Sequence, residues 1–126
     1  MLPDYKQTLH APLKFRHVHV VVLQATFSSG VADLDETNSS PSVSITKDTT
    51  GDYNVVVPKG QYVHVLGCHL DPASDNPTDA NVAAPAPRSW SATAGTGKVL
   101  FQDPAGALQD PVDGARLYLT VLVGRP

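Results

Sequence analysis

The segment Asp103-Pro-Ala-Gly-Ala-Leu-Gln-Asp-Pro-Val-Asp-Gly114 leads directly into Ala115-Arg-Leu-Tyr-Leu-Thr-Val-Leu-Val-Gly124. Its first part is rich in Pro, Gly and Asp, which favour turns. Its second part is almost continuously apolar, as is typical of a strand buried inside a sheet. We therefore expect a loop that feeds a buried strand over 115–123. The arrangement indicates a module that presents a sheet to a partner rather than an enzyme.

Apolar runs separated by turn residues continue through the rest of the chain. The eleven prolines and nine glycines fall between runs rich in Val, Thr and Tyr, which suit the pleated surface of a sheet. No window shows helical apolar spacing that is free of Gly and Pro. The predicted strands cover residues 15–27, 42–47, 52–57, 61–70, 97–102 and 115–123. We expect the second, third and fourth of them to form a meander.

These strands predict an all-β fold, an antiparallel β-sandwich or jelly roll of about six to eight strands. The length of 126 residues suits one domain, which we place at residues 15–126. Residues 1–14 carry little pattern and predict an extended N-terminal arm. Residues 71–95 form a long Pro- and Ala-rich excursion, which either leaves the domain as a functional loop or hides a short strand around Arg88–Thr93.

Alternation along the predicted strands selects the residues that face the core. The predicted core contains Phe15, Val21, Leu23, Val43, Ile45, Val55, Val57, Val63, Val65, Leu117, Leu119 and Val121. Strict alternation over 61–70 also predicts two faces for that strand. One face carries Tyr62, His64, Leu66 and Cys68, and the other carries Val63, Val65, Gly67 and His69.

Composition excludes several classes of function. The formal net charge is −3 and the nine Lys and Arg residues form no run. The sequence therefore lacks the basic patch that sequence-independent binding to nucleic-acid phosphates needs. No stretch approaches the ~20 apolar residues of a membrane span, and the first residues lack the layout of a secretion signal. The single Cys68 cannot form an internal disulfide, which indicates assembly in a reducing cytoplasm.

The histidines are the main candidates for chemistry. His17 and His19 alternate on one face of the first predicted strand and His64 lies on another strand, so the spacing permits the three rings to converge on a zinc ion. The interpretation we favour is that each ring is half-buried and makes one hydrogen bond. We therefore predict no metal ligands and no cofactor.

Carboxylates and nucleophiles give no stronger candidate. The acidic residues near predicted turns are Asp33, Asp35, Glu36, Asp103, Asp110 and Asp113. Those beside Pro or Gly are expected to cap turns through backbone hydrogen bonds. Cys68 lies in the middle of a strand and is expected to be a small buried apolar residue. We predict no catalytic residues.

Arginine and aromatic residues outside the predicted core strands are the candidates for binding. Trp90, the single Trp, lies in the excursion close to Arg88, and both residue types are enriched at binding hot spots. The Trp90 side chain either fills space in the core or anchors an interface. The predicted partner-contacting residues are Tyr5, Leu9, Phe15, Arg88 and Trp90.

Three segments resemble small β-rich virion proteins of tailed bacteriophages. Thr50-Gly-Asp-Tyr-Asn-Val-Val-Val-Pro58 resembles their T-G-x-Y-x-V-x-x-P strand. The loop 103–114 is similar to their G-A-x-x-D-P-x-x-G segment, and Arg116-Leu-Tyr-Leu-Thr-Val-Leu-Val-Gly-Arg125 is similar to their closing apolar strand. The resemblance covers residues 42–70 and 97–125.

This resemblance implies a capsid decoration (cement) protein without enzymatic activity. Such a protein is made in the host cytoplasm and then lies on the capsid surface of the virion. There it binds the major capsid protein as a dimer or trimer and bridges neighbouring subunits, with no nucleic-acid or membrane partner. The alternative is a tail or fibre module that binds a host receptor or glycan. A third hypothesis is a small metal enzyme built on His17, His19 and His64.

Overall fold

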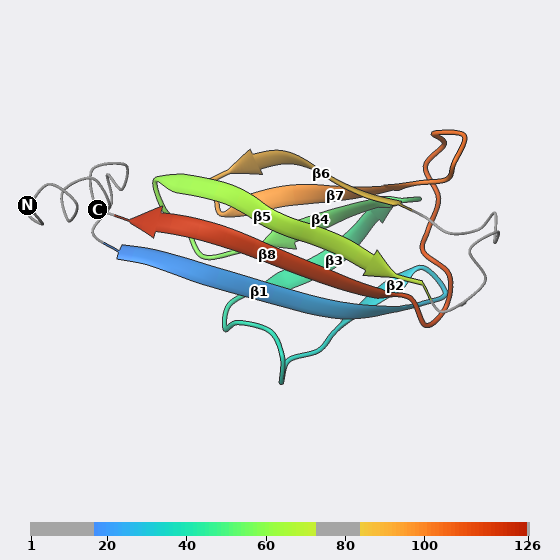
Figure 1. Cartoon of the computed structure of the whole chain (residues 1–126), viewed down its shortest axis with the longest axis horizontal. Coiled ribbons are helices and arrows are strands. Elements are labelled where there is room, and N and C mark those ends of the chain that lie inside the picture. The colour runs from blue at the N-terminus through green and yellow to red at the C-terminus, as the bar shows by residue number, and fades with distance from the viewer. Residues whose placement is uncertain (1–16, 73–83, 126) are drawn as a thin grey trace, which may run out of the picture.

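The computed structural model describes residues 17–72 and 84–125, which form eight strands and no helix. The strands are β1 (His17–Ser28), β2 (Val31–Leu34), β3 (Ser44–Thr49), β4 (Asp52–Val56), β5 (Tyr62–Asp71), β6 (Ala84–Ser91), β7 (Thr96–Gln102) and β8 (Arg116–Arg125). All strand pairs are antiparallel. The first sheet has the order β2-β1-β8-β5 and the second has the order β3-β4-β7-β6. The two sheets face each other (Figure 1), so the predicted antiparallel all-β class is confirmed.

Each of the six predicted strands overlaps an observed one, and β2 was not predicted. A two-residue turn, Ser29-Gly30, joins β1 to β2, and both of its residues have positive φ. This geometry is typical of the type I′ turns that close tight hairpins. The tight turn therefore accounts for the short strand β2 better than the composition of β2 does.

The predicted meander is wrong, because β5 lies in a different sheet from β3 and β4. After β4 the chain crosses between the sheets through residues 57–61. The Gly60 N–H donates to the Ala92 carbonyl over 2.9 Å, beside the second sheet, and the Gln61 N–H donates to the Gly124 carbonyl over 2.9 Å in the first sheet. Pro58, which donates no backbone hydrogen bond, lies where β4 has ended.

Part of the predicted excursion 71–95 is a strand and not a loop. Strand β6 (Ala84–Ser91) pairs with β7 and starts earlier than the hidden strand expected around Arg88–Thr93. Pro85 and Pro87 are tolerated because β6 is the edge strand of the second sheet, where a missing N–H does not break the ladder. The N-terminal arm 1–14 and residues 73–83 lie outside the described residues, as do Tyr5, Leu9 and Phe15.

The core lies between the inner faces of the two sheets. Its centre is a cluster of three aromatic rings, Phe27, Tyr53 and Phe101, each fully buried. The ring centroids are 5.2–5.4 Å apart and every pair meets edge to face, which is the favoured geometry for aromatic pairs. The aliphatic core is built by Val21, Leu23, Val43, Ile45, Val55, Val57, Leu70, Val99, Leu117, Leu119, Val121 and Val123. The predicted Val63 and Val65 are only partly buried and pack against this core.

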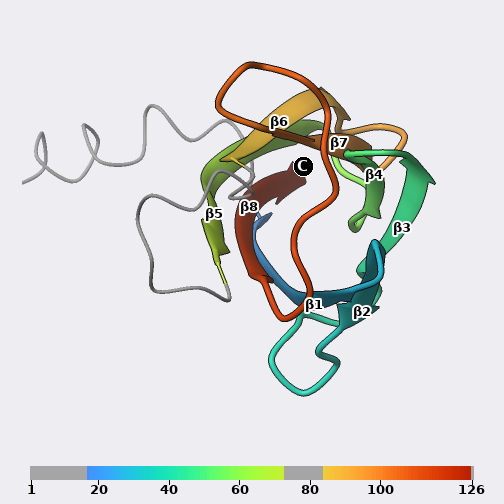
Figure 2. The same ribbon diagram turned by 90° about the vertical axis from the view of Figure 1, so that its right-hand side faces the viewer.

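Residues 103–114 close one end of the sandwich. In Figure 2 this loop, between β7 and β8, runs across the end that faces the viewer. The Gln109 N–H donates to the Phe101 carbonyl, and the Gly114 N–H donates to the Phe27 carbonyl. The loop is therefore bonded to strands of both sheets, and it leads into β8, which lies between β1 and β5 in the first sheet.

Asp110 fixes this loop to the β3–β4 hairpin. Its carboxylate accepts hydrogen bonds from Lys47 Nζ at 2.6 Å, from the Gly51 N–H at 2.8 Å and from Tyr53 Oη at 3.3 Å. Partial burial raises the pKa of Asp110, but the bonds from Lys47 and Gly51 outweigh it and hold the pKa below its ordinary value. The buried Tyr53 hydroxyl also donates to the Gly30 carbonyl at 2.6 Å, and burial, followed by the Asp110 charge, raises its pKa.

Replacing Asp110 with Asn is expected to lower the free energy of unfolding by about 1–2 kcal/mol at neutral pH. Hydrogen bonds to a charged group contribute about 1.5–3 kcal/mol, discounted here because the Asp110 side chain is 26% exposed. Since its folded-state pKa is lowered, the contribution is present above the unfolded-state pKa and is lost as the pH falls through the folded-state pKa. Urea unfolding at neutral and acidic pH measures this.

The difference between the two proteins should shrink as the solution becomes acidic. The exposed Asp33 supplies the control, because Asp33→Asn should leave both stability and its pH dependence almost unchanged. A stability difference that stays constant from neutral to strongly acidic pH would contradict the role given to Asp110.

Candidate binding surface

The candidate binding surface lies on the side of the first sheet that points away from the second sheet. It covers the rows of residues 18–24 of β1 with their partners on β8 and β5, and we call it the outer face. Strand register fixes which residues lie side by side on it. Val20 lies opposite Leu122, which lies opposite His64, and Gln24 lies opposite Tyr118, which lies opposite His69. Besides Gly67 and Gly124, these rows carry Val18, Val20, Val22, Gln24, Tyr118, Thr120, Leu122, Tyr62, His64, Leu66 and His69. The next row on the same side, toward the loop 103–114, is charged and carries Asp33, Thr26, Arg116 and Asp71.

The outer face is apolar and carries no Asp, Glu, Lys or Arg over these rows. Val20 is 60% exposed, Leu66 53%, Tyr62 41% and Val18 38%. Two pairs of rings lie on it, Tyr62 with His64 and His69 with Tyr118, each with centroids 6.3 Å apart. Scattered exposed apolar residues are ordinary, but a contiguous patch of them indicates an interaction site.

A β-bulge in β5 shapes one side of this face. Register shifts between Val65 and Gly67, so that Leu66 is an extra residue in β5. Such a bulge reverses the alternation of the residues that follow. It therefore places His69 on the outer face with His64, whereas strict alternation predicted opposite faces.

The same bulge turns Cys68 inward, opposite Leu119. Cys68 packs against the core, as expected for a small apolar residue. Burial raises the pKa of its thiol to about 11. The thiolate form is therefore rare near neutral pH, and Cys68 does not have the character of a nucleophile.

The outer side of the second sheet has different chemistry. There Lys98 Nζ lies 3.0 Å from Asp48 Oδ2 and 3.0 Å from Asp52 Oδ2. The hydrogen bonds that Lys98 Nζ donates to the carboxylates of Asp48 and Asp52 raise the pKa of Lys98. Such charged groups are well solvated. The outer side of the second sheet therefore suits a different kind of partner from the apolar outer face of the first sheet.

The three histidines considered for a metal site do not converge. His17 and His19 share the inward-facing side of β1 with Val21, whereas His64 lies on the outer face in the row of Val20. The sheet separates the rings, because residues that alternate along a strand point to opposite sides. Among residues 17–72 and 84–125, no group of three His, Cys, Asp or Glu residues could hold a metal ion.

Trp90 lies on the second sheet and not on the outer face. Its indole covers Gly97 of β7 and packs against the core, as expected of a core plug. Its Nε1 is buried and has no hydrogen-bond partner in the part of the chain that the structure describes. The neighbouring Arg88 is exposed and donates to the Pro87 carbonyl at 2.9 Å.

The acidic residues near turns mostly support backbone structure. Asp35 accepts hydrogen bonds from the side chain and backbone of Asn38, and these bonds lower its pKa. Asp103 accepts from the Ala107 N–H at 2.9 Å, as expected of a turn cap. Asp113 differs, because it accepts from the Ser29 N–H at 2.6 Å and so links two distant turns.

The outer face was missed by sequence reasoning because both sides of β1 are apolar. Such a pattern is typical of a strand that is buried on both sides. The signal that could have found the face is Gly67, since a glycine inside a strand often marks a bulge. With the bulge placed there, Tyr62, His64 and His69 fall on one side.

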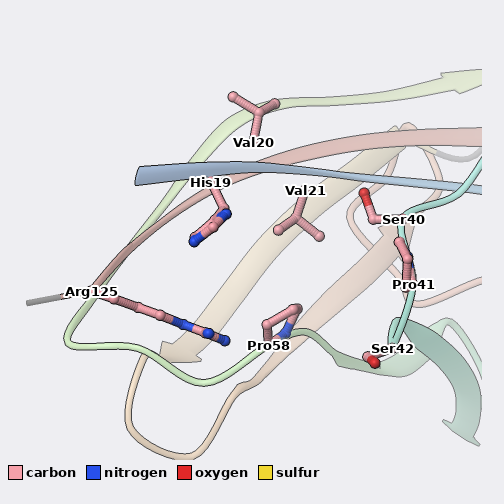
Figure 3. Close-up of a pocket in the computed structure, with 8 residues that line it drawn as sticks. All are labelled: His19, Val20, Val21, Ser40, Pro41, Ser42, Pro58 and Arg125. Carbon is pink, nitrogen blue, oxygen red and sulfur yellow. The ribbon is translucent and has the colours of Figure 1, made fainter. Parts of the chain in front are cut away.

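A pocket of about 500 Å³ lies at the end of the sandwich opposite to the loop 103–114. Its lining residues are His19, Val20, Val21, Ser40, Pro41, Ser42, Pro58 and Arg125. Figure 3 shows the His19 ring and the Arg125 side chain directed toward the pocket from β1 and β8, while the Val20 side chain points away from it.

Comparison of the chain with protein-family models, with curated proteins and with solved structures finds no match. The described residues contain no helix that is long and apolar enough to span a membrane.

Proposed function

We propose that this protein is a bacteriophage capsid decoration protein whose outer face binds the capsid. The observation that carries the proposal is the contrast between the uncharged, apolar outer face of the first sheet and the Lys98–Asp48–Asp52 cluster on the other sheet. Interface centres are depleted in charged residues and enriched in aromatic ones. The proposed partner is the major capsid protein, and the proposed location is the surface of the virion.

The size of the outer face agrees with binding to a repetitive surface. Three strands about 4.8 Å apart and rows about 3.3 Å apart give the face an area of roughly 300 Å². A stable one-to-one interface buries about 800 Å² on each partner. A single outer face therefore supports only a weak contact. Several copies on one dimer or trimer reinforce one another when they bind neighbouring subunits of a shell.

The proposal includes an eight-stranded β-sandwich as the rigid body and residues 1–14 as an arm that adds contact area. It includes no catalytic residue and no cofactor. The partner-contacting roles first predicted for Arg88 and Trp90 belong to the opposite sheet and are secondary in this proposal. The buried aromatic rings and the bonded loop 103–114 support a body that stays rigid while the outer face binds.

Replacing Val20 with Asp is expected to weaken binding to shells at least tenfold while leaving folding intact. The new carboxylate would lose its water in an apolar interface, which is costly. Because Val20 is 60% exposed, the stability should change by no more than about 0.5 kcal/mol. Co-sedimentation with empty shells assembled from the major capsid protein of the same phage measures the binding.

Val31→Asp is the matched control. Val31 is 62% exposed, and it pairs with Ser28 at the far end of β1, about 26 Å from Val20 at 3.3 Å per residue. It should bind shells like the unchanged protein. Equal loss in the two variants, or no loss in either, would count against the outer face. A protein that ignores shells but binds a glycan array would favour the alternative of a tail or fibre module.

A further inference from the structure

The pocket lies at the end of the sandwich where the first residues of β1 extend beyond the strands that face the rest of it. The first four residues of β1 are all exposed, and the alternation of buried and exposed positions begins only at Val21. His17 and His19 therefore lie on the inward-facing side of the sheet without a facing strand. His17 lies in register opposite Arg125, so one end of the sheet gathers these three side chains on the same side.

The polar groups of the pocket are donors that suit an oxyanion. Arg125 donates through Nε to the Lys59 carbonyl at 2.9 Å, which fixes the side chain while its terminal nitrogens remain directed into the pocket (Figure 3). A guanidinium group held in this way matches a carboxylate geometrically. The His19 ring and the hydroxyls of Ser40 and Ser42 complete the polar lining, and none of the lining residues is acidic.

One wall of the pocket is held in place by backbone and side-chain bonds. The Ser40 Oγ accepts from the Val22 N–H at 2.9 Å, and the Ser40 N–H donates to the Val22 carbonyl at 2.8 Å. Ser42 has a φ of 64°, in the left-handed region that a serine seldom adopts. Strained residues in a constrained wall recur at binding sites, and a wall that is already ordered loses little entropy when a ligand binds.

The remaining lining is apolar. Val21, Pro41 and Pro58 surround the space between the donors. A small hydrophilic ion would leave these surfaces without contacts, whereas a carboxylate attached to a branched apolar group would fill both parts. Pockets with mostly apolar walls and a few convergent polar groups are the usual form of ligand sites.

We infer that this pocket binds an organic carboxylate, with the carboxylate on Arg125 and His19 and an apolar body against Val21, Pro41 and Pro58. The pocket and the outer face lie on opposite sides of β1: Val20 is among the lining residues, but its side chain points away from the pocket toward the outer face (Figure 3). The inference stands whether or not the protein decorates a capsid. An acidic side chain of a protein and a free organic acid present the same chemistry to the pocket.

Titration of the full chain with 4-methylpentanoate, followed by ¹H–¹⁵N correlation spectra that include the Arg side chains, tests the inference. We expect saturable chemical-shift changes at Arg125 Nε, His19 and Ser42, with a dissociation constant in the millimolar range. The isosteric neutral 4-methylpentanamide should bind at least about tenfold more weakly, because charge-assisted hydrogen bonds are lost. Inorganic phosphate, which lacks an apolar body, should also bind more weakly.

Arg125→Gln and His19→Gln should each weaken the binding of 4-methylpentanoate, the former by about tenfold or more. Arg116→Gln removes the same charge at the opposite end of β8 and should change the dissociation constant less than twofold. Equal binding of the acid and its amide, or unchanged binding in both pocket variants, would overturn the inference. N-acetyl-leucyl-aspartyl amide separates the sources, since tighter binding than 4-methylpentanoate points to a protein segment and weaker binding to a free acid.

Discussion

Replacing Phe101 with Ala is expected to lower the free energy of unfolding by about 3–5 kcal/mol, as is typical when a large buried aromatic residue is truncated. Phe101 is completely buried, and its ring meets Phe27 at 5.3 Å and Tyr53 at 5.4 Å, both edge to face. Domains of this size are stable by only about 5–15 kcal/mol. The variant should therefore be close to the limit of folding, and urea unfolding followed by circular dichroism measures the loss.

Two further variants make the Phe101 result specific. Phe101→Leu keeps part of the volume and should lose clearly less stability than the Ala variant. Val56→Ala changes a residue that is 43% exposed and should fall within about 0.5 kcal/mol of the unchanged protein. A loss below about 1 kcal/mol for Phe101→Ala would mean that the aromatic cluster is not the centre of the core.

Gly97→Ala is expected to destabilise the protein by about 1–3 kcal/mol, because it overpacks a tight contact. A Cβ atom at Gly97 would overlap the indole ring atoms Cδ2, Cε2 and Cε3 of Trp90. The ring would have to move away from the core toward water. Since Trp90 is the single Trp of the chain, its fluorescence emission should shift to longer wavelength in the native state.

The double variant Trp90→Leu with Gly97→Ala separates this contact from a backbone effect. A smaller side chain at position 90 leaves room for the new methyl group, so the two changes should cost less together than the sum of their separate losses. Strict additivity in the double variant, or a native emission spectrum of the single variant Gly97→Ala identical to that of the unchanged protein, would show that the indole does not rest on Gly97.

Local sequence patterns were sufficient for the strands and for much of the core. Val and Leu alternate along the chain with the period of a strand, so Val21, Leu23, Leu117 and Leu119 were correctly assigned inward. The central rings of Phe27, Tyr53 and Phe101 were not assigned, because each stands near a turn where the pattern is short. Their burial depends on the loop 103–114, which closes that end of the sandwich over them.

Partners distant in sequence were beyond the reach of local patterns. Nothing near residues 52–70 shows that the chain changes sheets between β4 and β5, because this depends on hydrogen bonds to Ala92 and Gly124. The outer face depends on the register of β1, β8 and β5 together with one bulge. Arg88 and Trp90, which were predicted to contact a partner, lie on β6 of the second sheet and not on this face.

The pairing of β1 with β8, which joins His17 to Arg125, has a consequence for synthesis of the protein. Ribosomes add about 5–20 residues per second, so β1 emerges several seconds before its partner strand exists. The β3–β4 and β6–β7 hairpins can pair earlier, because their partners are close in sequence, whereas distant pairings form slowly. The outer face is therefore assembled only after β8 has been made, and truncated translation products that lack β8 would lack this face.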